Sequence, residues 1–401
     1  MNSGKKKRSP MPVAAIGMIA STGLGYWPIY VLPLLVGQLM DSRGFTASQA
    51  GLLGSMEIAA IGLMTLGSSR ILSRGNRRRT AVLGACLALL GQLLSAVTHA
   101  FLPMALSRTL TGLGEGLAFA VGSAALTGQE EPDRLFGLVF VGRALIGSAL
   151  APLLSLTTSR LGVDPFILMS VVTLLAAIVI GLHSELAAPL TAADAAALSG
   201  NGESPDLLNR APALTGTLLA AGVALLALLD TVSWTFIERR GLSIGMSPMT
   251  VGSVLGLTNF LGMVGATLPI VAGERLGRVA PVLVGTCIGA VAAVVPYISG
   301  SRVHFIVFSS AYVIAFAAVI PFCMGSAATL DRDGMWASIV GAMLVAPTAM
   351  GPFLAGFVID NYGFQGIPWV LATLGAFTAI AFAAFFLTNR SRQQRLAITA
   401  T

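Results

Sequence analysis

The sequence predicts an all-α membrane protein made of two similar bundles of six helices. Of its 401 residues, 55% are hydrophobic and 10% are charged, whereas soluble domains carry roughly 25% charged residues. The mean hydropathy is +0.84. The second half also repeats the first at an offset of 201 residues. The positions that repeat are Gly51, Arg74, Arg77 and Cys86, which correspond to Gly252, Arg275, Arg278 and Cys287.

Twelve apolar segments reach the length of about 20 residues that a helix needs to cross a bilayer. They are far longer than the roughly 10 residues of a membrane β-strand and do not alternate between apolar and polar residues. The predicted helices are residues 11–39, 47–70, 79–99, 101–127, 135–159, 165–183, 213–236, 248–272, 279–299, 303–329, 335–359 and 366–388.

The first segment follows four basic residues, Lys5 to Arg8, as a signal peptide would. Its apolar run is too long for a signal peptide and no clean cleavage site follows it, so we interpret it as a retained helix. The segment 185–212 is rich in Ala, Ser, Gly and Pro and is expected to be a cytoplasmic linker. It separates an N-terminal bundle, 1–184, from a C-terminal bundle, 213–390, and the tail 391–401 is expected to be disordered.

Basic residues concentrate on one side of the predicted membrane. When the N-terminus is placed in the cytoplasm, 17 of the 24 Lys and Arg residues fall on the cytoplasmic side and five on the outer side. This asymmetry favours both termini inside. The basic residues are spread over short loops rather than gathered on one face, which argues against a nucleic-acid partner.

The loop after the second helix carries a basic cluster that has a counterpart in the second half. Residues Ser69–Arg78 read SRILSRGNRR, and Glu274–Arg278 read ERLGR. Together they resemble the loop signature of the major facilitator superfamily, G-x-L-a-D-R-x-G-R-R, although Ser69, Ser73 and Asn76 depart from it. The resemblance implies a breakable cytoplasmic latch that presents cations to helix C-termini and carboxylates. The residues expected in it are Arg74, Arg77, Arg78, Glu274, Arg275, Gly277 and Arg278.

A second resemblance lies in the fourth helix. Residues Arg108–Gly116, RTLTGLGEG, are similar to the R-x-x-x-G-x-G signature of the same superfamily, which is often linked to proton coupling. The resemblance covers the whole chain through length, helix number and repeat. It implies the major facilitator fold, in which helices 1, 4, 7 and 10 line a cavity and helices 3, 6, 9 and 12 are peripheral.

Charged residues inside the predicted helices are few. They are Glu57, Arg108, Glu115, Arg143 and Asp230, and none lies at the centre of a peripheral helix. A charge at the centre of a spanning helix costs at least about 2.5–3.5 kcal/mol and often has a function. We therefore expect Glu57, Arg108, Glu115 and Asp230 to take part in proton coupling, with Glu57 and Arg108 as a candidate pair. Arg108, Glu115 and Asp230 are expected to border one wet cavity between the bundles. The alternative is a static buried ion pair.

Further candidates for the substrate cavity are aromatic or polar. Tyr26, Trp27 and Tyr30 cluster in the first helix and could stack on a ring or simply pack around Pro28 and Pro33. Trp234 follows Asp230 by one turn, where a carboxylate and an aromatic ring could recognise a cation. Arg143 suits a carboxylate or phosphate, and Asn259 is a weaker polar candidate. These charges of both signs leave the charge of the substrate open.

The sequence thus predicts a secondary transporter that moves a small organic molecule across a bacterial-type inner membrane by alternating access, coupled to protons and acting as a monomer. An uncoupled facilitator and a lipid- or lysolipid-moving protein are the alternatives. No enzyme motif such as HExxH, Cys-x-x-Cys or a phosphate loop occurs. We therefore expect no catalytic residue, no cofactor and no metal site.

Overall fold

The computed structural model describes residues 11–68, 71–72, 76–127, 132–183, 213–272, 277–330 and 335–399. Within these ranges, 12 helices are long and apolar enough to cross a membrane, and no strand occurs. The described chain is therefore all-helical, as the sequence predicts.

The first six spans agree closely with the predicted segments. In chain order they are α1 (Met11–Arg43), α2 (Ala47–Gly67), α4 (Arg77–Val97), α5 (Phe101–Thr127), α6 (Pro132–Leu161) and α7 (Pro165–Leu182). Their ends follow from local chemistry. Gly44 and Gly162 follow α1 and α6 with φ of 68° and 62°, a conformation that glycine adopts without steric cost. Thr46 starts α2 with a capping box.

The second six spans include two interrupted helices. The elements are α9 (Ala213–Thr235), α10 (Ile237–Ser243), α11 (Pro248–Ala272), α12 (Val279–Ile298), α13 (Arg302–Ala328), α14 (Met335–Val345), η4 (Pro347–Ala349), α15 (Gly351–Tyr362) and α16 (Gly366–Thr399). The predicted helix 335–359 is broken around η4, because Pro347 and Pro352 cannot donate backbone hydrogen bonds. The seventh span is broken at Phe236.

The end of the chain differs from the expected disordered tail at 391–401, because α16 continues as a helix to Thr399. The segment after Ser391 contains Arg, Gln, Leu and Ala and lacks Gly and Pro, a composition with high helix propensity. The linker expected at 185–212 lies outside the described residues.

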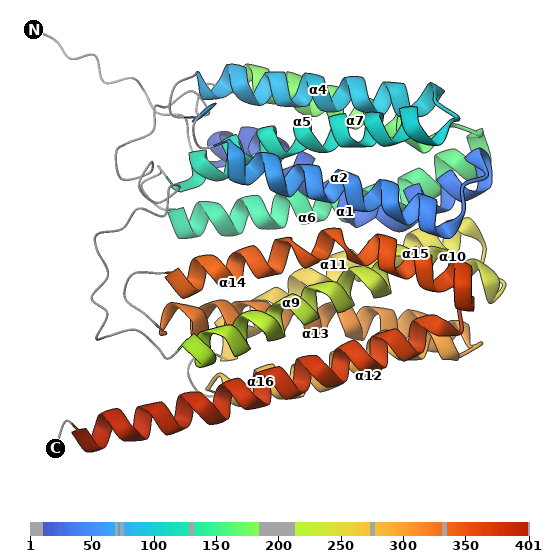
Figure 1. The fold of residues 1–401 in the computed structure, drawn as a ribbon. Helices are drawn as coiled ribbons and strands as arrows, with labels where there is room; N and C mark the ends of the chain where they lie inside the picture. Colours follow the sequence, from blue (N-terminus) through green and yellow to red (C-terminus); the bar gives the residue numbers. More distant parts are fainter. Residues whose placement is uncertain are drawn as a thin grey trace, which may run out of the picture.

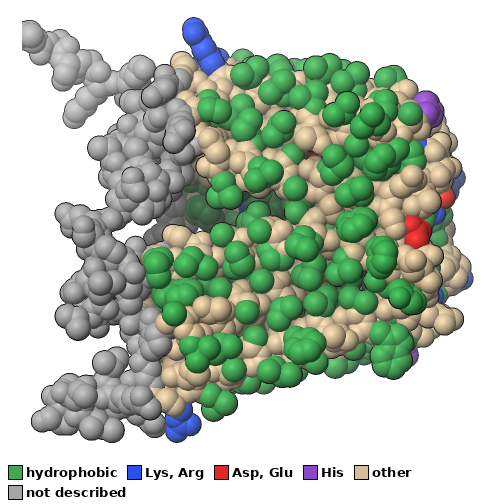
Figure 2. All heavy atoms as spheres, in the orientation of Figure 1, with side chains coloured by type: hydrophobic (Ala, Val, Ile, Leu, Met, Phe, Trp, Pro, Cys, Tyr) green, Lys and Arg blue, Asp and Glu red, His purple; other side chains and the backbone are tan. Residues whose placement is uncertain are grey.

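The helices form two bundles, α1–α7 and α9–α16, which lie above and below one another in Figure 1. They meet mainly where α2 packs against α15 and α6 against α11, and α1 also contacts α9 and α10. Large apolar side chains are exposed on the outer helices, such as Leu175 of α7 and Leu387 of α16, and Figure 2 shows many such side chains across one face. This surface is suited to lipid.

The contact between the two halves is concentrated at one end of the molecule. We call the end where α1 begins the terminal end, and the end where α1 finishes the far end. At the far end, the amides of Ala47 and Ser48 at the start of α2 donate to the Asp360 carboxylate of α15, at 3.0 and 2.8 Å. Deeper in the same contact, the Phe353 amide donates to Ser55 Oγ at 3.0 Å.

Arg239 of α10 makes a second contact between the two halves at the far end. Its guanidinium forms a salt bridge with Asp41 of α1 at 2.8 Å and donates to the Gly37 carbonyl. At the terminal end, by contrast, Figure 2 shows a recess between the two halves. Among the described residues, the two halves are thus in contact at the far end, and a recess lies between them at the terminal end.

Candidate functional site

Arg108 and Glu57 form a buried ion pair between α5 and α2, as the sequence predicts for this pair. Arg108 Nε donates to Glu57 Oε2 at 3.1 Å, and Nη2 donates to Glu57 Oε1. The contact is therefore bidentate, which is the geometry that favours Arg over Lys. Arg108 is 1% exposed and Glu57 3% exposed, so water does not screen the pair.

Helix α4 completes the shell around this pair. Arg108 Nη1 donates to Gln92 Oε1 at 2.9 Å and to Ser95 Oγ at 3.4 Å. Glu115, two turns after Arg108, is also buried and interacts with Glu57 and Gln92. Its Oε2 atom is buried without a hydrogen-bond partner. The Glu57 cluster, defined as these five residues, thus holds one guanidinium and two carboxyl groups.

The Glu57 cluster lies inside the N-terminal half, which corrects the expectation that Arg108 and Glu115 border a cavity between the bundles. The reason is the orientation of α2. Glu57 and Ser55 are two residues apart, so they point about 200° apart around the helix axis. Ser55 contacts α15 of the other half, which leaves Glu57 directed toward α5 and α4.

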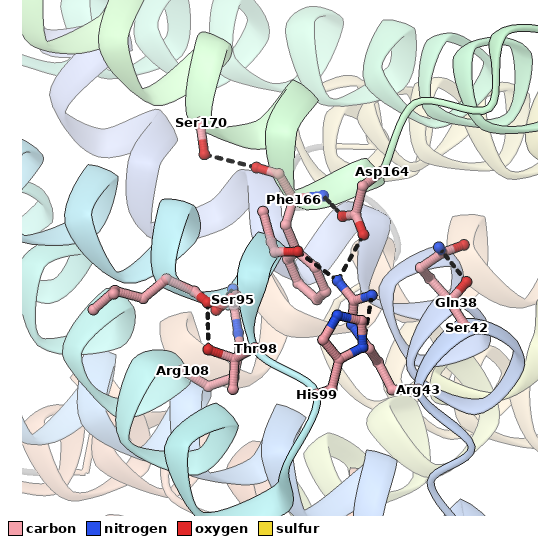
Figure 3. A network of polar contacts seen from close by, with 12 residues as sticks. Gln38, Ser42, Arg43, Ser95, Thr98, His99, Arg108, Asp164, Phe166 and Ser170 are labelled. Atoms are coloured by element: carbon pink, nitrogen blue, oxygen red, sulfur yellow. Dashed lines mark hydrogen bonds and ion pairs between the residues drawn. The ribbon is translucent and has the colours of Figure 1, made fainter.

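Phe166 of α7 links this cluster to the far end, as Figure 3 shows. Its ring lies 5.0 Å from the Arg108 guanidinium carbon, while its amide donates to Asp164 at 2.8 Å. Asp164 also forms a 2.9 Å salt bridge with Arg43 at the end of α1. The Arg43–Asp164 salt bridge therefore joins the end of α1 to the start of α7 at the far end of the N-terminal half.

Arg143 of α6 lies in a different environment, against aromatic side chains of α1. Its guanidinium carbon is 3.7 Å from the centroid of the Tyr26 ring and 5.1 Å from that of Phe140. The guanidinium also lies beside the Tyr30 side chain, and the Trp27 indole donates to the Arg143 carbonyl at 3.0 Å. The structure therefore brings together four of the residues predicted for the substrate cavity: Tyr26, Trp27, Tyr30 and Arg143. We call them the Arg143 cluster.

Two glycines allow α1 to approach α6 so closely. A Cβ atom at Gly147 would lie 2.6 Å from Cε2 of Tyr30, and one at Gly142 would lie 2.9 Å from Cγ1 of Ile19. Either distance is shorter than a normal carbon contact. Because these glycines flank Arg143 on α6, the aromatic residues of α1 can pack directly around its guanidinium.

Two hydrogen bonds join α1 to the other half near the Arg143 cluster. Asn259 Nδ2 of α11 donates to the Tyr30 carbonyl at 3.4 Å, and Trp234 Nε1 of α9 donates to the Ile29 carbonyl at 2.9 Å. Asn259 and Trp234, both predicted for the cavity, thus lie at the junction of the halves. The Arg143 cluster is adjacent to this junction, whereas the Glu57 cluster is not.

Asp230 lies apart from both clusters. Its carboxylate accepts a hydrogen bond from the Tyr312 hydroxyl of α13 at 2.6 Å, so it belongs to the C-terminal half. Near it, a small cavity of about 10 Å³ is lined by Tyr312, Ser233 and Trp234, among others. Asp230 therefore does not share one site with Arg108 and Glu115, contrary to the prediction from the sequence.

The residues predicted for the latch are described only in part. Arg74, Glu274 and Arg275 lie outside the described residues. Arg78 donates to the Gly181 carbonyl in the last turn of α7, and Arg278 donates to Thr329 Oγ1, the C-cap residue of α13, at 3.1 Å. Both cations thus reach helix C-termini, each within its own half. Gly277 has φ of 58°, which explains a glycine there, and Arg77 is buried in the first turn of α4.

Sequence reasoning missed several residues that shape these sites. Gln92 belongs to a helix expected to be peripheral, and a polar residue in an otherwise apolar span was its signal. Tyr312, the partner of Asp230, gave no such signal. Asp360 stands directly after the predicted helix 335–359. Among the described residues, no group of three or more His, Cys, Asp or Glu side chains is placed to hold a metal ion.

Comparison with solved structures places the fold among transporters. The chain is similar to a bacterial homologue of the human lysosomal transporter Spinster, solved in an inward-facing and unoccupied conformation, with 14% identity, 95% and 97% of the two chains covered and a TM-score of 0.68. It is also similar to the peptide transporter POT in complex with sulfate, with 16% identity, 94% of each chain and a TM-score of 0.70. A third similar structure is that of the nucleoside transporter NupG, with 11% identity, 94% of this chain and 99% of that chain covered, and a TM-score of 0.73.

No curated protein matches the chain by sequence. The family profile described as Major Facilitator Superfamily matches residues 13–332, which is most of the chain and extends across both halves. Together with twelve candidate spans in two bundles, this match shows that the chain belongs to the major facilitator superfamily and is a secondary transporter.

Proposed function

We propose that the protein moves a small organic molecule across the membrane by alternating access, driven by a proton gradient. The observation that carries this proposal is the asymmetry between the two ends. In the part of the chain that the structure describes, hydrogen bonds join the halves at the far end and near the middle, whereas a recess separates the halves at the terminal end (Figure 2). This is the arrangement expected of one of the two states of an alternating-access cycle.

The Arg143 cluster is the candidate substrate site. It lies beside the junction, where Asn259 and Trp234 bond to α1 from the other half. A molecule bound there would contact both halves at once, so the two states would differ in the contacts that they make with it. A ligand shifts a conformational equilibrium only through such a difference.

The Glu57 cluster is the candidate proton site. It contains two carboxyl groups and one guanidinium, so it is electrically neutral when one proton is bound. Glu57 and Glu115 lie close to each other, and a proton on either one would let the two carboxyl groups hydrogen-bond. Burying a net charge is costly, so proton occupancy and the packing of α2 against α5 are linked.

Helix α2 is the element that connects this proton site to the closure of the far end. One face carries Glu57 against α5, and the opposite face carries Gly51 and Ser55 against α15. Repacking Glu57 against Arg108 therefore moves the helix that closes the far end. The break around η4 lets α14 move separately from α15, since a 3₁₀ segment interrupts regular helical hydrogen bonding.

The proposed orientation follows the charge asymmetry of the sequence. Both termini would face the cytoplasm, the terminal end would open inward, and the membrane would be a bacterial-type inner membrane. The protein would act as a monomer, with Asp230 and Tyr312 as a second titratable pair in the C-terminal half. Gly277, Arg278, Arg77 and Arg78 would lie on the cytoplasmic side.

The test is transport by the purified protein in vesicles with an imposed pH difference. Ligands would first be found by their effect on thermal stability, because a ligand of the folded state stabilises it by mass action. For a ligand so identified, we expect accumulation against its gradient by the wild type. Glu115→Gln should lose this accumulation but retain exchange of labelled for unlabelled ligand, which requires no net proton movement.

The outcomes separate the possible readings. Accumulation by Glu57→Gln and Glu115→Gln equal to that of the wild type would remove the Glu57 cluster from coupling. Wild-type flux that follows the ligand gradient alone, at every imposed pH difference, would indicate an uncoupled facilitator. Asp230→Asn, tested in the same vesicles, shows whether the C-terminal pair contributes to coupling.

A further inference from the structure

Arg143 is a buried cation without a carboxylate partner. It is 9% exposed, and no carboxylate of the described chain lies within salt-bridge distance of it. Its Nε atom is buried and has no hydrogen-bond partner. A guanidinium has five N–H donors, and here Tyr30 is the polar side chain beside them.

The aromatic contacts compensate only part of the cost of burying this charge. Stacking on Tyr26 stabilises a desolvated cation by about 2 kcal/mol, whereas the penalty for removing an ion from water is several kcal/mol. In the same half, Arg108 is buried with a bidentate carboxylate from Glu57. The counter-ion that Arg108 receives from the protein is missing at Arg143.

The geometry around Arg143 indicates what would supply that counter-ion. The planar guanidinium matches the two oxygens of a carboxylate or a phosphate-like group. The rings of Tyr26 and Phe140 beside it provide flat apolar surface for the rest of a small molecule. The position is about 16 Å along α6 from its start at the terminal end, at a rise of about 1.5 Å per residue, which is the end where the halves are separated.

We propose that Arg143 binds the oxyanion of the substrate and that the substrate is therefore a small organic anion with an apolar or aromatic part next to its charged group. This inference rests on the proposed function and specifies its substrate class. Arg143 remains held to α1 through Tyr26, so the anion is presented to the junction where Asn259 of the other half reaches Tyr30.

The test uses four probes that share one ring and differ in charge. Benzoate and phenylphosphonate are anions, benzamide is neutral and benzamidinium is a cation. Binding is measured on purified full-length protein in detergent by thermal stabilisation over a concentration series, at constant ionic strength. We expect at least one of the anions to bind tenfold or more tightly than both benzamide and benzamidinium.

Two substitutions of Arg143 test whether this residue causes the preference for anions. Arg143→Gln should lose the anion preference, and Arg143→Lys should keep part of it, because the charge remains without the planar fork. Arg160→Gln is the matched control, since Arg160 lies on the same helix and is exposed. It removes the same charge and should leave the anion preference unchanged.

Equal binding of the anions, benzamide and benzamidinium by the wild type would overturn the proposal, whether or not any variant folds. An anion preference that survives in Arg143→Gln would overturn it as well. Because no gradient is present in detergent, this experiment is independent of proton coupling. Anion binding without gradient-driven accumulation would refute the coupling alone, and accumulation of a neutral or cationic ligand would refute the anion site alone.

Discussion

The interior of the N-terminal half and the junction between the halves hold their polar groups in opposite ways. In the interior, Arg108 receives a bidentate carboxylate, an amide oxygen and a hydroxyl, all buried. Near the middle of the junction, contacts are single hydrogen bonds such as Asn259 to Tyr30, and Arg143 has no carboxylate partner among the described residues. The difference indicates that the interior provides stability, while the junction provides contacts that can break and re-form.

The largest expected effect is on stability, at the Glu57 cluster. Glu57→Leu removes the bidentate carboxylate from the buried Arg108 guanidinium, and breaking a buried pair in this way costs about 3–5 kcal/mol. We therefore expect a strongly lowered unfolding temperature of the purified protein in detergent.

The control for this substitution removes both charges. Replacement of a complete buried pair by apolar residues is often neutral, so Glu57→Leu combined with Arg108→Met should recover most of the lost stability. A double variant as unstable as Glu57→Leu alone would show that the pair is not an isolated interaction and that the shell of Gln92 and Ser95 depends on it.

The next effect concerns the glycine contact of α2 with α15. A Cβ atom at Gly51 would lie 2.8 Å from the Pro352 carbonyl carbon, so Gly51→Ala must push the helices apart. Overpacking of this kind costs about 1–3 kcal/mol, and here the closed far end is what it destabilises. With Ala151→Cys as a buried reporter in the α6–α11 contact, we expect labelling by an impermeant maleimide to rise tenfold or more in a background without Cys86, Cys287 and Cys323.

Gly67→Ala is the matched control for Gly51→Ala, because it lies on the same helix and a Cβ there meets nothing within 4 Å. It should leave the labelling rate of the reporter unchanged. A similar increase from both substitutions would mean that α2 responds to helix propensity rather than to its contact with α15.

A smaller effect is expected from Arg143→Gln on stability. The substitution removes the stacking on Tyr26, which is worth about 2 kcal/mol, but it also removes a buried charge that lacks a carboxylate. The two changes oppose each other, so the unfolding temperature should fall far less than in Glu57→Leu. A loss as large as that of Glu57→Leu would contradict the distinction between interior and junction.

The helices could be predicted from the sequence because each one is long and uniformly apolar. The start of α5 at Phe101 and of α11 at Pro248 coincides with the predicted segments. The breaks at Phe236 and around η4 were not predicted. No proline lies beside Phe236, and at η4 a proline in a membrane helix can either break the helix or be accommodated without a break. Hydropathy does not distinguish the two cases.

The sequence predicted which residues would form the candidate sites, but not which of these residues would lie together. The Glu57–Arg108 pair followed from two intramembrane charges of opposite sign at similar depth. The separation of this pair from Asp230 did not follow, because which face of α2 meets α15 depends on packing at Gly51 and Ser55. Arg108 and Arg143 look equivalent as single charges in apolar helices, and their difference arises from partners on other helices, Glu57 for one and Tyr26 for the other.

The smallest expected effect is at Asp360, which caps α2 across the junction. Its carboxylate accepts from the amides of Ala47 and Ser48, where a negative charge also favours the helix N-terminus. Removing a capping side chain costs about 1 kcal/mol, so Asp360→Ala should increase labelling of the Ala151→Cys reporter about fivefold.

Asp360→Asn separates the cap from the charge, because asparagine caps helix N-termini about as well as aspartate. We expect this variant to stay within twofold of the parent. If Asn were as disruptive as Ala, the interaction would be one of charge with the helix dipole, and high salt would then open the far end of the parent protein as well. If neither variant changed the labelling, the far end would be closed by the glycine contacts and Arg239 without help from Asp360.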